Sequence, residues 1–249
     1  MKKTDKSELL YGRLPLLEAL KAGRRKFLRV YLRESRVLDP ENLALWEALQ
    51  SQQIPVVRVS SDWFKQRFKD QTHQGWAADL SPYPYVEDFF KHLSEEGSST
   101  LLALDQIQDP QNLGSLMRVA EATGVRGVIL PKRHSCLVQP SVSKASAGAV
   151  EHLPVTLVPN LVEALKKLQK LNYWLVGTEA SASTSVLDFE WPTRTVLVMG
   201  SEGEGLRRLT KETCDFLVHL PMKGQVTSLN VSTAASACLY LLARYQQRT

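Results

Sequence analysis

The chain has few cysteines and no long apolar run, and these absences exclude several classes of protein. Its three cysteines, Cys136, Cys214 and Cys238, lie far apart and show no paired metal-ligand spacing. Neither a disulfide framework nor a zinc site is indicated, and a reduced, cytoplasmic setting is expected. No stretch of about 18 apolar residues occurs, and no apolar segment follows the charged start. We therefore expect neither a secretory signal nor a membrane span.

Internal repeats and low-complexity segments are also missing. A single proline-rich stretch near residue 81 divides the chain into two parts. The 249 residues, 43% of them hydrophobic, suffice for one large domain or two small ones. The stretch Ser81-Pro82-Tyr83-Pro84-Tyr85 is expected to be extended, because each proline restricts the residue before it. This predicts a small domain over residues 1–80, a linker over 81–98 and a larger domain over 99–249.

Residues 1–80 alternate between helical and extended patterns, which predicts a small α/β unit. The expected helices are 14–22, 40–52 and 62–68, and the expected strands are 27–32, 56–59 and 76–80. A further helix over 86–96 is expected to lead into the larger domain.

The larger domain has short runs that are apolar throughout, at helix-sized intervals. Such runs belong to strands covered on both faces, as in a parallel sheet. The expected strands are 101–104, 127–130, 155–158, 173–177, 196–199 and 216–220, and the expected helices are 114–123, 161–171, 206–214 and 231–245. The predicted fold is a doubly wound α/β domain.

The net charge of +5 comes from the first third of the chain. Residues 1–80 hold 15 basic and 10 acidic residues, which leaves 16 of each in the remainder. Most of the excess comes from Lys21, Arg24, Arg25, Lys26, Arg29, Arg33 and Arg36. This density suits phosphate contacts, but it also suits a solvated, solubilising face, and both interpretations stay open.

Three polar segments, 112–118, 200–205 and 228–230, begin where predicted strands end or shortly after. The carboxyl edge of such a sheet is where α/β domains usually bind ligands, so we expect the three segments to converge there. Asn112 to Arg118 opens a helix, whose amides and Arg118 could bind a phosphate. The alternative is a helix cap followed by an exposed arginine.

The second segment is a turn with Gly200, Gly203 and Gly205, which is not the G-x-G-x-x-G spacing of a dinucleotide loop. Glu202 and Glu204 would repel a pyrophosphate, so a nucleotide-dependent oxidoreductase is disfavoured. A cationic or phosphate-free adenosyl ligand fits better, and a flexible turn is the alternative. In the third segment, Ser228 or Asn230 is a natural N-cap for a last helix rich in Ser and Ala.

Together the three segments resemble the motifs of the SpoU/TrmH family of RNA ribose 2′-O-methyltransferases. The matching residues are Asn112-Leu113-Gly114 with Arg118, Met199 to Leu206, and Leu220-Pro221-Met222 leading to Ser228-Leu229-Asn230-Val231-Ser232. Tyr11-Gly12 before Leu17-Glu18-Ala19-Leu20, and His73-Gln74-Gly75, resemble the L30e/L7Ae-like RNA-binding domain of the RlmB branch. That branch methylates a guanosine ribose in 23S rRNA.

The resemblance implies a deep trefoil knot in the larger domain, where the residues alone suggest an ordinary open sheet. It implies S-adenosylmethionine as cofactor and no metal, with a homodimer formed in part by the last helix. The cofactor contacts that it implies are Thr178, Gly200, Leu220, Ser228 and Leu229.

The family assigns catalysis to the arginine of the first motif, here Arg118, in a site shaped by Asn112, Glu202, Ser228 and Asn230. An arginine is an awkward base, because a guanidinium stays protonated in proteins. Our hypothesis is that Arg118 holds an RNA phosphate and orients the 2′-hydroxyl, while a neighbouring acceptor takes the proton. A tRNA 2′-O-methyltransferase and a non-catalytic rRNA-binding assembly factor are the alternatives.

The basic N-terminal domain is expected to recognise the RNA, because every nucleotide has a 2′-hydroxyl and selectivity needs contacts elsewhere. Neutralising Lys2, Lys3, Arg24 and Arg25 should then weaken RNA binding. His73 either touches RNA or closes a turn before Gly75. The domain's aromatic residues are expected to be mostly core; they are Tyr11, Phe27, Tyr31, Trp63, Phe64 and Trp76.

Overall fold

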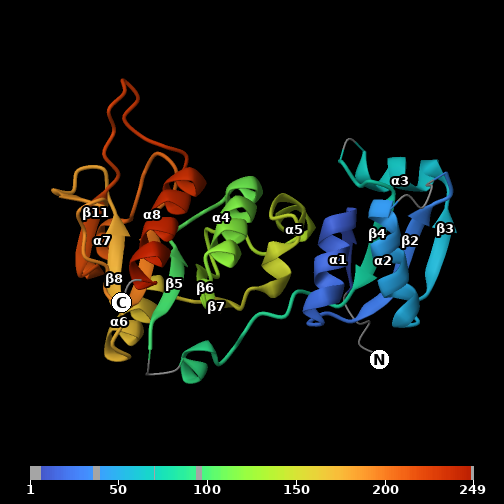
Figure 1. The fold of residues 1–249 in the computed structure, drawn as a ribbon, viewed down its shortest axis with the longest axis horizontal. Helices are drawn as coiled ribbons and strands as arrows, with labels where there is room; N and C mark the ends of the chain where they lie inside the picture. Colours follow the sequence, from blue (N-terminus) through green and yellow to red (C-terminus); the bar gives the residue numbers. More distant parts are fainter. Residues whose placement is uncertain (1–6, 36–39, 70, 94–96, 248–249) are drawn as a thin grey trace. The chain divides into compact units, whose positions relative to one another are not determined.

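The structure, a computed structural model, describes residues 7–35, 40–69, 71–93 and 97–247. Contacts along the chain group into two compact units (Figure 1). The N-terminal unit takes residues 1–84 together with 138–152, and the C-terminal unit takes 85–137 together with 153–249. The predicted domains, 1–80 and 99–249, differ from these units mainly in one respect: residues 138–152 belong to the N-terminal unit.

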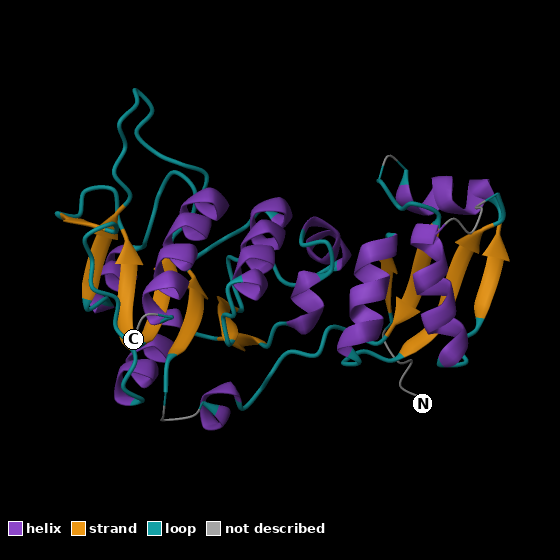
Figure 2. Ribbon diagram, in the orientation of Figure 1, coloured by secondary structure: helices purple, strands orange, loops and turns teal. Residues whose placement is uncertain are grey.

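The N-terminal unit contains a four-stranded sheet in the order β1-β4-β2-β3 (Figure 2). Strand β4 lies antiparallel between β1 and β2, and β3 is parallel to β2. The strands are β1 (Glu8–Tyr11), β2 (Phe27–Arg33), β3 (Val56–Val59) and β4 (Trp76–Leu80). The helices are α1 (Arg13–Ala22), α2 (Pro40–Ser51) and α3 (Ser61–Phe68). All elements predicted within residues 1–80 are found, and β1 was missed.

Three of the aromatic residues are in the core of this unit, as expected. Trp76 and Phe64 are fully buried and Tyr11 is 6% exposed. The Trp76 indole donates a hydrogen bond to Asn42 Oδ1 at 2.7 Å, so its polar atom is satisfied inside the protein. His73 Nδ1 accepts a hydrogen bond from Gly75 N at 3.0 Å, which confirms that His73 closes the turn before Gly75.

Residues 138–152 form α5 (Pro140–Ala145) and the 3₁₀ helix η2 (Ala149–His152), which pack against α1 and β1. A buried ion pair fixes them there. Arg25 Nη1 lies 3.4 Å from Glu151 Oε1, and Arg25 Nη2 lies 2.6 Å from Glu8 Oε2. Ser143 Oγ donates to Glu151 Oε1 at 2.7 Å. Burial nevertheless raises the pKa of Glu151, although Arg25 and Ser143 oppose this shift.

These contacts correct the expectation that Arg24 and Arg25 bind RNA. The Arg25 side chain is 2% exposed and its charge is paired, so it offers nothing to a phosphate. Arg24 donates to the backbone oxygens of Glu151 and Pro84. Lys2 and Lys3 lie outside the described residues.

The C-terminal unit is built on a seven-stranded, all-parallel sheet in the order β7-β6-β5-β10-β8-β11-β9. The strands are β5 (Ser99–Leu104), β6 (Gly127–Pro131), β7 (Val155–Val158), β8 (Trp174–Thr178), β9 (Thr184–Ser185), β10 (Arg194–Met199) and β11 (Phe216–His219). The helices are α4 (Pro110–Ala122), α6 (Leu161–Lys170), α7 (Arg208–Thr213) and α8 (Val231–Gln246). The predicted parallel α/β fold is confirmed.

The helix predicted over 86–96 is wrong for its described part, which holds only the 3₁₀ turn η1 (Phe89–His92). Val86 N instead donates to Val155 O, which holds the chain extended beside β7. Phe89 is buried in the core of this unit, with Val86 and Phe90 packed against it. Residues 94–96 of the predicted helix lie outside the described residues.

Strand β10 occupies the middle of the sheet, between β5 and β8, and is buried throughout. Helices α4 and α8 pack together, and Figure 1 shows the long loop from β11 to α8 extending beyond the strand ends. The trefoil knot implied by the resemblance stays a prediction. Among the described helices, none is long and apolar enough to cross a membrane.

Candidate active site

The three predicted segments meet at the carboxyl edge of the parallel sheet through a network of three polar side chains. Asn112 Nδ2 donates to Glu202 Oε2 at 3.0 Å. Asn230 Nδ2 donates to Asn112 Oδ1 at 2.8 Å and contacts Glu202 Oε2 at 3.3 Å. Residues up to 118 positions apart in the chain are therefore joined directly, and we call Asn112, Glu202 and Asn230 the polar triad.

Two helix caps orient the amides of the polar triad. Asp109 caps α4 by accepting hydrogen bonds from Gln111 N and Asn112 N, so the Asn112 side chain is not needed as a cap. Asn230 caps α8: its Oδ1 accepts from Ser232 N at 2.9 Å and from Ser232 Oγ at 2.6 Å. The Asn230 amide nitrogen must then point toward Asn112 and Glu202. One carboxylate oxygen of Glu202 has no partner among the described residues.

The glycine turn that carries Glu202 is very tight. Backbone hydrogen bonds run both ways between Ser201 and Gly205, at 3.1 and 3.0 Å. A Cβ on Gly200 would lie only 2.0 Å from the Gly205 carbonyl carbon, so no side chain fits at this position. Gly203 has a φ of 87°, in the region that favours glycine. The glycines thus fix the position of Glu202.

An ion pair with a buried carboxylate, which the sequence did not reveal, ties the end of this turn to β5. Asp105 directly follows β5 and is fully buried. Its carboxylate accepts from Arg207 Nη2 at 2.7 Å, Nε at 2.8 Å and N at 3.1 Å. A charged residue immediately after a wholly apolar strand was the available signal. The pair holds the turn against the edge of the sheet.

Arg207→Met should lower the free energy of unfolding by about 3 kcal/mol, because it leaves the Asp105 carboxylate buried without a counter-ion. Asp105→Asn should lower the free energy of unfolding less, by about 1 kcal/mol. It leaves Arg207 without its counter-ion, but that side chain is 47% exposed and can be hydrated. Urea unfolding of both variants checks the order. An equal loss, or a larger loss for Asp105→Asn, would contradict this account.

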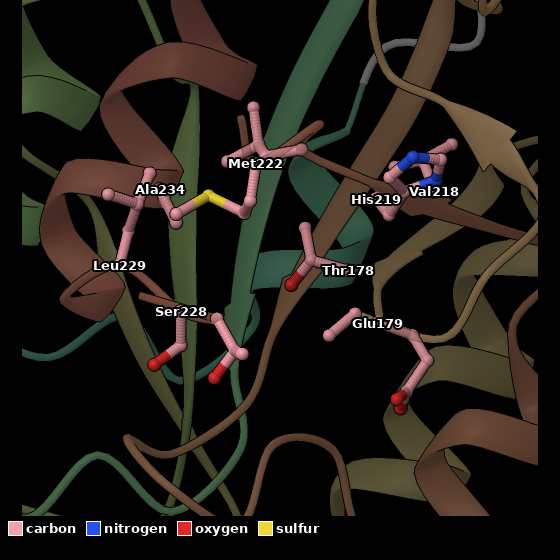
Figure 3. A pocket seen from close by; sticks show the side chains of 11 residues that line it. Thr178, Glu179, Val218, His219, Met222, Ser228, Leu229 and Ala234 are labelled. Carbon is pink, nitrogen blue, oxygen red and sulfur yellow. The ribbon is translucent and has the colours of Figure 1, made fainter. Parts of the chain in front are cut away.

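A pocket of about 150 Å³ lies at the ends of β8 and β11, and Figure 3 shows the residues that line it. Four of the predicted cofactor contacts line it: Thr178, Leu220, Ser228 and Leu229. Figure 3 shows the apolar side chains of Met222, Leu229 and Ala234 grouped together. Leu229 directly precedes Asn230, so the pocket and the polar triad adjoin. Gly200 is not a lining residue, and its contact with a cofactor stays a prediction.

Sequence reasoning did not assign several other lining residues to the pocket. Those at or near the ends of β8 and β11 are Glu179, Ala180, Val218 and His219, and those in the following loop and α8 are Met222, Thr227 and Ala234. The position of the first four at the ends of two adjacent strands was the signal that could have identified them. Glu179 also contacts Lys211 Nζ at 3.0 Å, and its pKa is lowered: burial raises it, but hydrogen bonds from Lys211 and Ser181 outweigh burial.

Arg118 is the predicted site residue that the structure does not join to the others. It lies on α4 six residues after Asn112, and its side chain is exposed. It has no hydrogen-bond or ion-pair partner among the described residues. An exposed arginine on the helix that carries Asn112 is available to an anionic ligand, and its role stays a prediction.

The chain matches known proteins over both units. Residues 99–240 match the SpoU rRNA methylase family, and residues 9–86 match an RNA 2′-O ribose methyltransferase substrate-binding domain. A Bacillus subtilis protein, YacO, whose name places it among TrmH family tRNA/rRNA methyltransferases, is 38% identical over 97% of each chain.

Solved structures agree with these matches. An RNA 2′-O ribose methyltransferase superposes with a TM-score of 0.84 at 26% identity, covering 99% of this chain and 91% of the other. The SpoU methyltransferase AviRb from Streptomyces viridochromogenes, crystallised with AdoMet, gives 0.82 at 24% identity over 98% and 92%. A TrmH/SpoU tRNA modifying enzyme from A. aeolicus gives 0.55 at 22% identity and covers 62% of this chain and 78% of its own. The chain therefore belongs to the SpoU methylase family of RNA-modifying enzymes.

Proposed function

We propose that this enzyme transfers a methyl group from S-adenosylmethionine to the ribose 2′-hydroxyl of a guanosine in 23S rRNA, in the cytoplasm. The observation that carries the proposal is the junction of a small apolar pocket with the polar triad. Leu229 lines the pocket and its neighbour Asn230 belongs to the triad. A cofactor and an acceptor hydroxyl could thus be held side by side.

The pocket fits an adenosyl cofactor better than a dinucleotide. Its lining combines apolar side chains with the hydroxyls of Thr178 and Ser228 and one carboxylate, Glu179, but includes no lysine or arginine to bind a pyrophosphate. A carboxylate suits a ligand with a positive sulfonium and an ammonium group. Its volume is below the roughly 300–1,000 Å³ that encloses a whole ligand, so the cofactor would be partly open on one side. AviRb, which shares the fold, binds AdoMet.

S-adenosylmethionine supplies a methyl group that its sulfonium already activates. The protein must then hold the ribose oxygen in line and accept its proton. We assign the proton to Glu202, the carboxylate of the polar triad, whose unpartnered oxygen is free to accept it. The amides of Asn112 and Asn230 bond the other oxygen and fix the carboxylate. Arg118 would bind an RNA phosphate and so position the nucleotide.

The extent of the fold matches supports rRNA as the substrate. The tRNA modifying enzyme from A. aeolicus covers only 62% of this chain, whereas the RNA 2′-O ribose methyltransferase covers 99%. The match to the tRNA enzyme leaves more than a third of this chain uncovered, whereas the other match spans both units, and a second domain suits a large folded RNA. tRNA is the second candidate, because the name of the B. subtilis relative includes both substrates.

Methyl transfer to unmodified transcripts tests the proposal. The purified protein is incubated with methyl-tritiated S-adenosylmethionine and either 23S rRNA or a mixed tRNA pool, followed by nuclease digestion. We expect 2′-O-methylguanosine from 23S rRNA only. Label in tRNA alone would select the second candidate, and label on a base or in no RNA would refute ribose methylation. Thermal stabilisation by NAD but not by S-adenosylmethionine would refute the cofactor.

Arg118→Lys should lower kcat by at least about tenfold, because lysine keeps the charge but cannot form bidentate hydrogen bonds with a phosphate. Affinity for S-adenosylmethionine should stay unchanged. Arg126→Lys is the matched control, since Arg126 is also exposed and lies just beyond α4. Near-normal turnover of Arg118→Lys would refute the assigned role.

We further propose that the enzyme is a homodimer that uses α8. The helix presents Tyr240, which is 58% exposed, next to a run of small residues. A large exposed aromatic residue on such a helix favours close packing against another subunit. Sedimentation at 28.0 kDa, the mass of one chain, would contradict the dimer.

A further inference from the structure

The N-terminal unit contains a lysine, Lys144, whose hydrogen-bond acceptor among the described residues is neutral. Lys144 Nζ donates to Gln74 Oε1 at 3.0 Å, and the backbone N of Arg13 donates to the same oxygen at 3.2 Å. Lys144 is half-buried and forms no ion pair with any described carboxylate. Its ammonium group therefore has two N–H donors left without an acceptor from the described chain.

Two further basic residues, His73 and Arg33, belong to the same group, because the charges of Arg33 and Lys144 both act on His73. The His73 ring stacks on Phe64 with centroids 4.5 Å apart, and its Nδ1 is engaged by Gly75 N. Arg33 Nε is buried and has no hydrogen-bond partner among the described residues. We call Arg13, Arg33, His73 and Lys144 the basic cluster.

The charges of the basic cluster act on one another. The pKa of His73 is lowered mainly by burial and also by the positive charges of Arg33 and Lys144. The pKa of Lys144 is lowered mainly by burial and also by the positive charge of Arg13. The charges that lower these two pKa values are positive, so the field at His73 and Lys144 disfavours a further cation and favours an anion.

The backbone provides room for the lysine. Gly12 has a φ of 96°, and a Cβ there would lie 2.9 Å from Lys144 Nζ and 3.2 Å from Lys144 Cδ. Gly12, Gln74 and Lys144 come from three separate segments, the last of them the 138–152 segment. The methyl-transfer chemistry uses none of them, although Tyr11-Gly12 and His73-Gln74-Gly75 are motifs of the sequence.

We propose that the basic cluster binds a phosphodiester of the substrate RNA, with Lys144 as its principal contact. The phosphate oxygens accept the free ammonium protons, and Arg33 can add a charge-assisted hydrogen bond. The inference rests on RNA being the substrate of the proposed reaction. The competing explanation is that Lys144 only anchors residues 138–152 to Gln74.

The salt dependence of RNA binding separates these explanations. Filter binding of a 23S rRNA transcript is measured over a range of NaCl for the wild type, Lys144→Met and Lys65→Met. Lys65 is the matched control, because it belongs to the same unit, is 76% exposed and loses the same charge. Each phosphate contact contributes about 0.7 to the slope of log K against log salt on single-stranded RNA.

We expect Lys144→Met to weaken RNA binding about three- to tenfold at 0.15 M salt and to reduce the slope by about 0.7, with no change for Lys65→Met. Affinity for S-adenosylmethionine should be unaffected. A lower affinity with the wild-type slope would mean structural anchoring and would overturn the inference, as would unchanged affinity.

A second variant covers the case in which Lys144→Met does not fold. Arg33→Gln should then reduce the slope in the same direction, and a wild-type slope would overturn the inference. Methylation of the same transcript by the wild type is measured in parallel. Normal methylation with an unchanged slope in the variants refutes the phosphate site alone, whereas absence of methylation refutes the proposed reaction.

Discussion

Glu202→Gln is expected to lower kcat by about 100-fold while leaving the affinity for S-adenosylmethionine almost unchanged. Glutamine has the shape of glutamate, and its side-chain oxygen can still accept the amide protons of Asn112 and Asn230. It carries no negative charge, however, and cannot take the proton of the 2′-hydroxyl. Loss of a general base typically costs 10²–10⁴-fold, and the lower end suits an exposed carboxylate. Single-turnover methylation of 23S rRNA measures the step directly.

Glu204→Gln is the matched control for this prediction. Glu204 is exposed in the same glycine turn and carries the same charge, but it has no partner among the described residues. Its turnover should match the wild type. If Glu202→Gln keeps turnover within about threefold of Glu204→Gln, the carboxylate does not accept the proton and the role of the polar triad is only to shape the site.

Gly200→Ala is expected to destabilise the protein by about 2–3 kcal/mol and to weaken S-adenosylmethionine binding at least tenfold. The added methyl group would meet the Gly205 carbonyl carbon and oxygen and Leu206 N at 2.0 to 2.3 Å, all of them backbone atoms. The turn would have to open, which would break the Ser201–Gly205 bridge and displace Glu202. Calorimetric titration with the cofactor and urea unfolding measure the two effects.

The control is Gly224→Ala, in the loop between β11 and α8. A Cβ there has nothing within 4 Å, and Gly224 does not have a positive φ, so the substitution should be neutral. A Gly200→Ala protein with wild-type stability and cofactor affinity would show that the turn tolerates a side chain. The predicted cofactor role of Gly200 would then fail.

The sequence predicted the C-terminal sheet well because its strands are apolar throughout. Six runs and four helices agree with the structure to within a few residues, since burial on both faces leaves a clear pattern. Strand β1 was missed because four residues, half of them partly exposed, show little alternation. Helix α5 and η2 were missed because the residues that stabilise them, Arg25 and Glu18, lie more than 100 positions earlier.

The sequence predicted which residues belong to the site, but not the hydrogen bonds between them. The three motifs indicated Asn112, Glu202 and Asn230, yet only the structure shows that both amides bond one carboxylate oxygen. Asp105 and Arg207 are 102 positions apart, and no local pattern connects them. Counting basic residues also placed Arg25 in a basic region available to RNA, although Glu8 and Glu151 neutralise it.

The 138–152 segment limits where the protein can be divided into fragments. The chain passes between the two units at residues 84–85, 137–138 and 152–153, so a fragment that starts at residue 85 keeps part of the N-terminal unit. In that fragment Glu151 would lose Arg25, and Val142 and Ser143, now buried, would become exposed. An exchange of the RNA-binding module between relatives must therefore carry this distant stretch with it, since the module is encoded in two separate places of the gene.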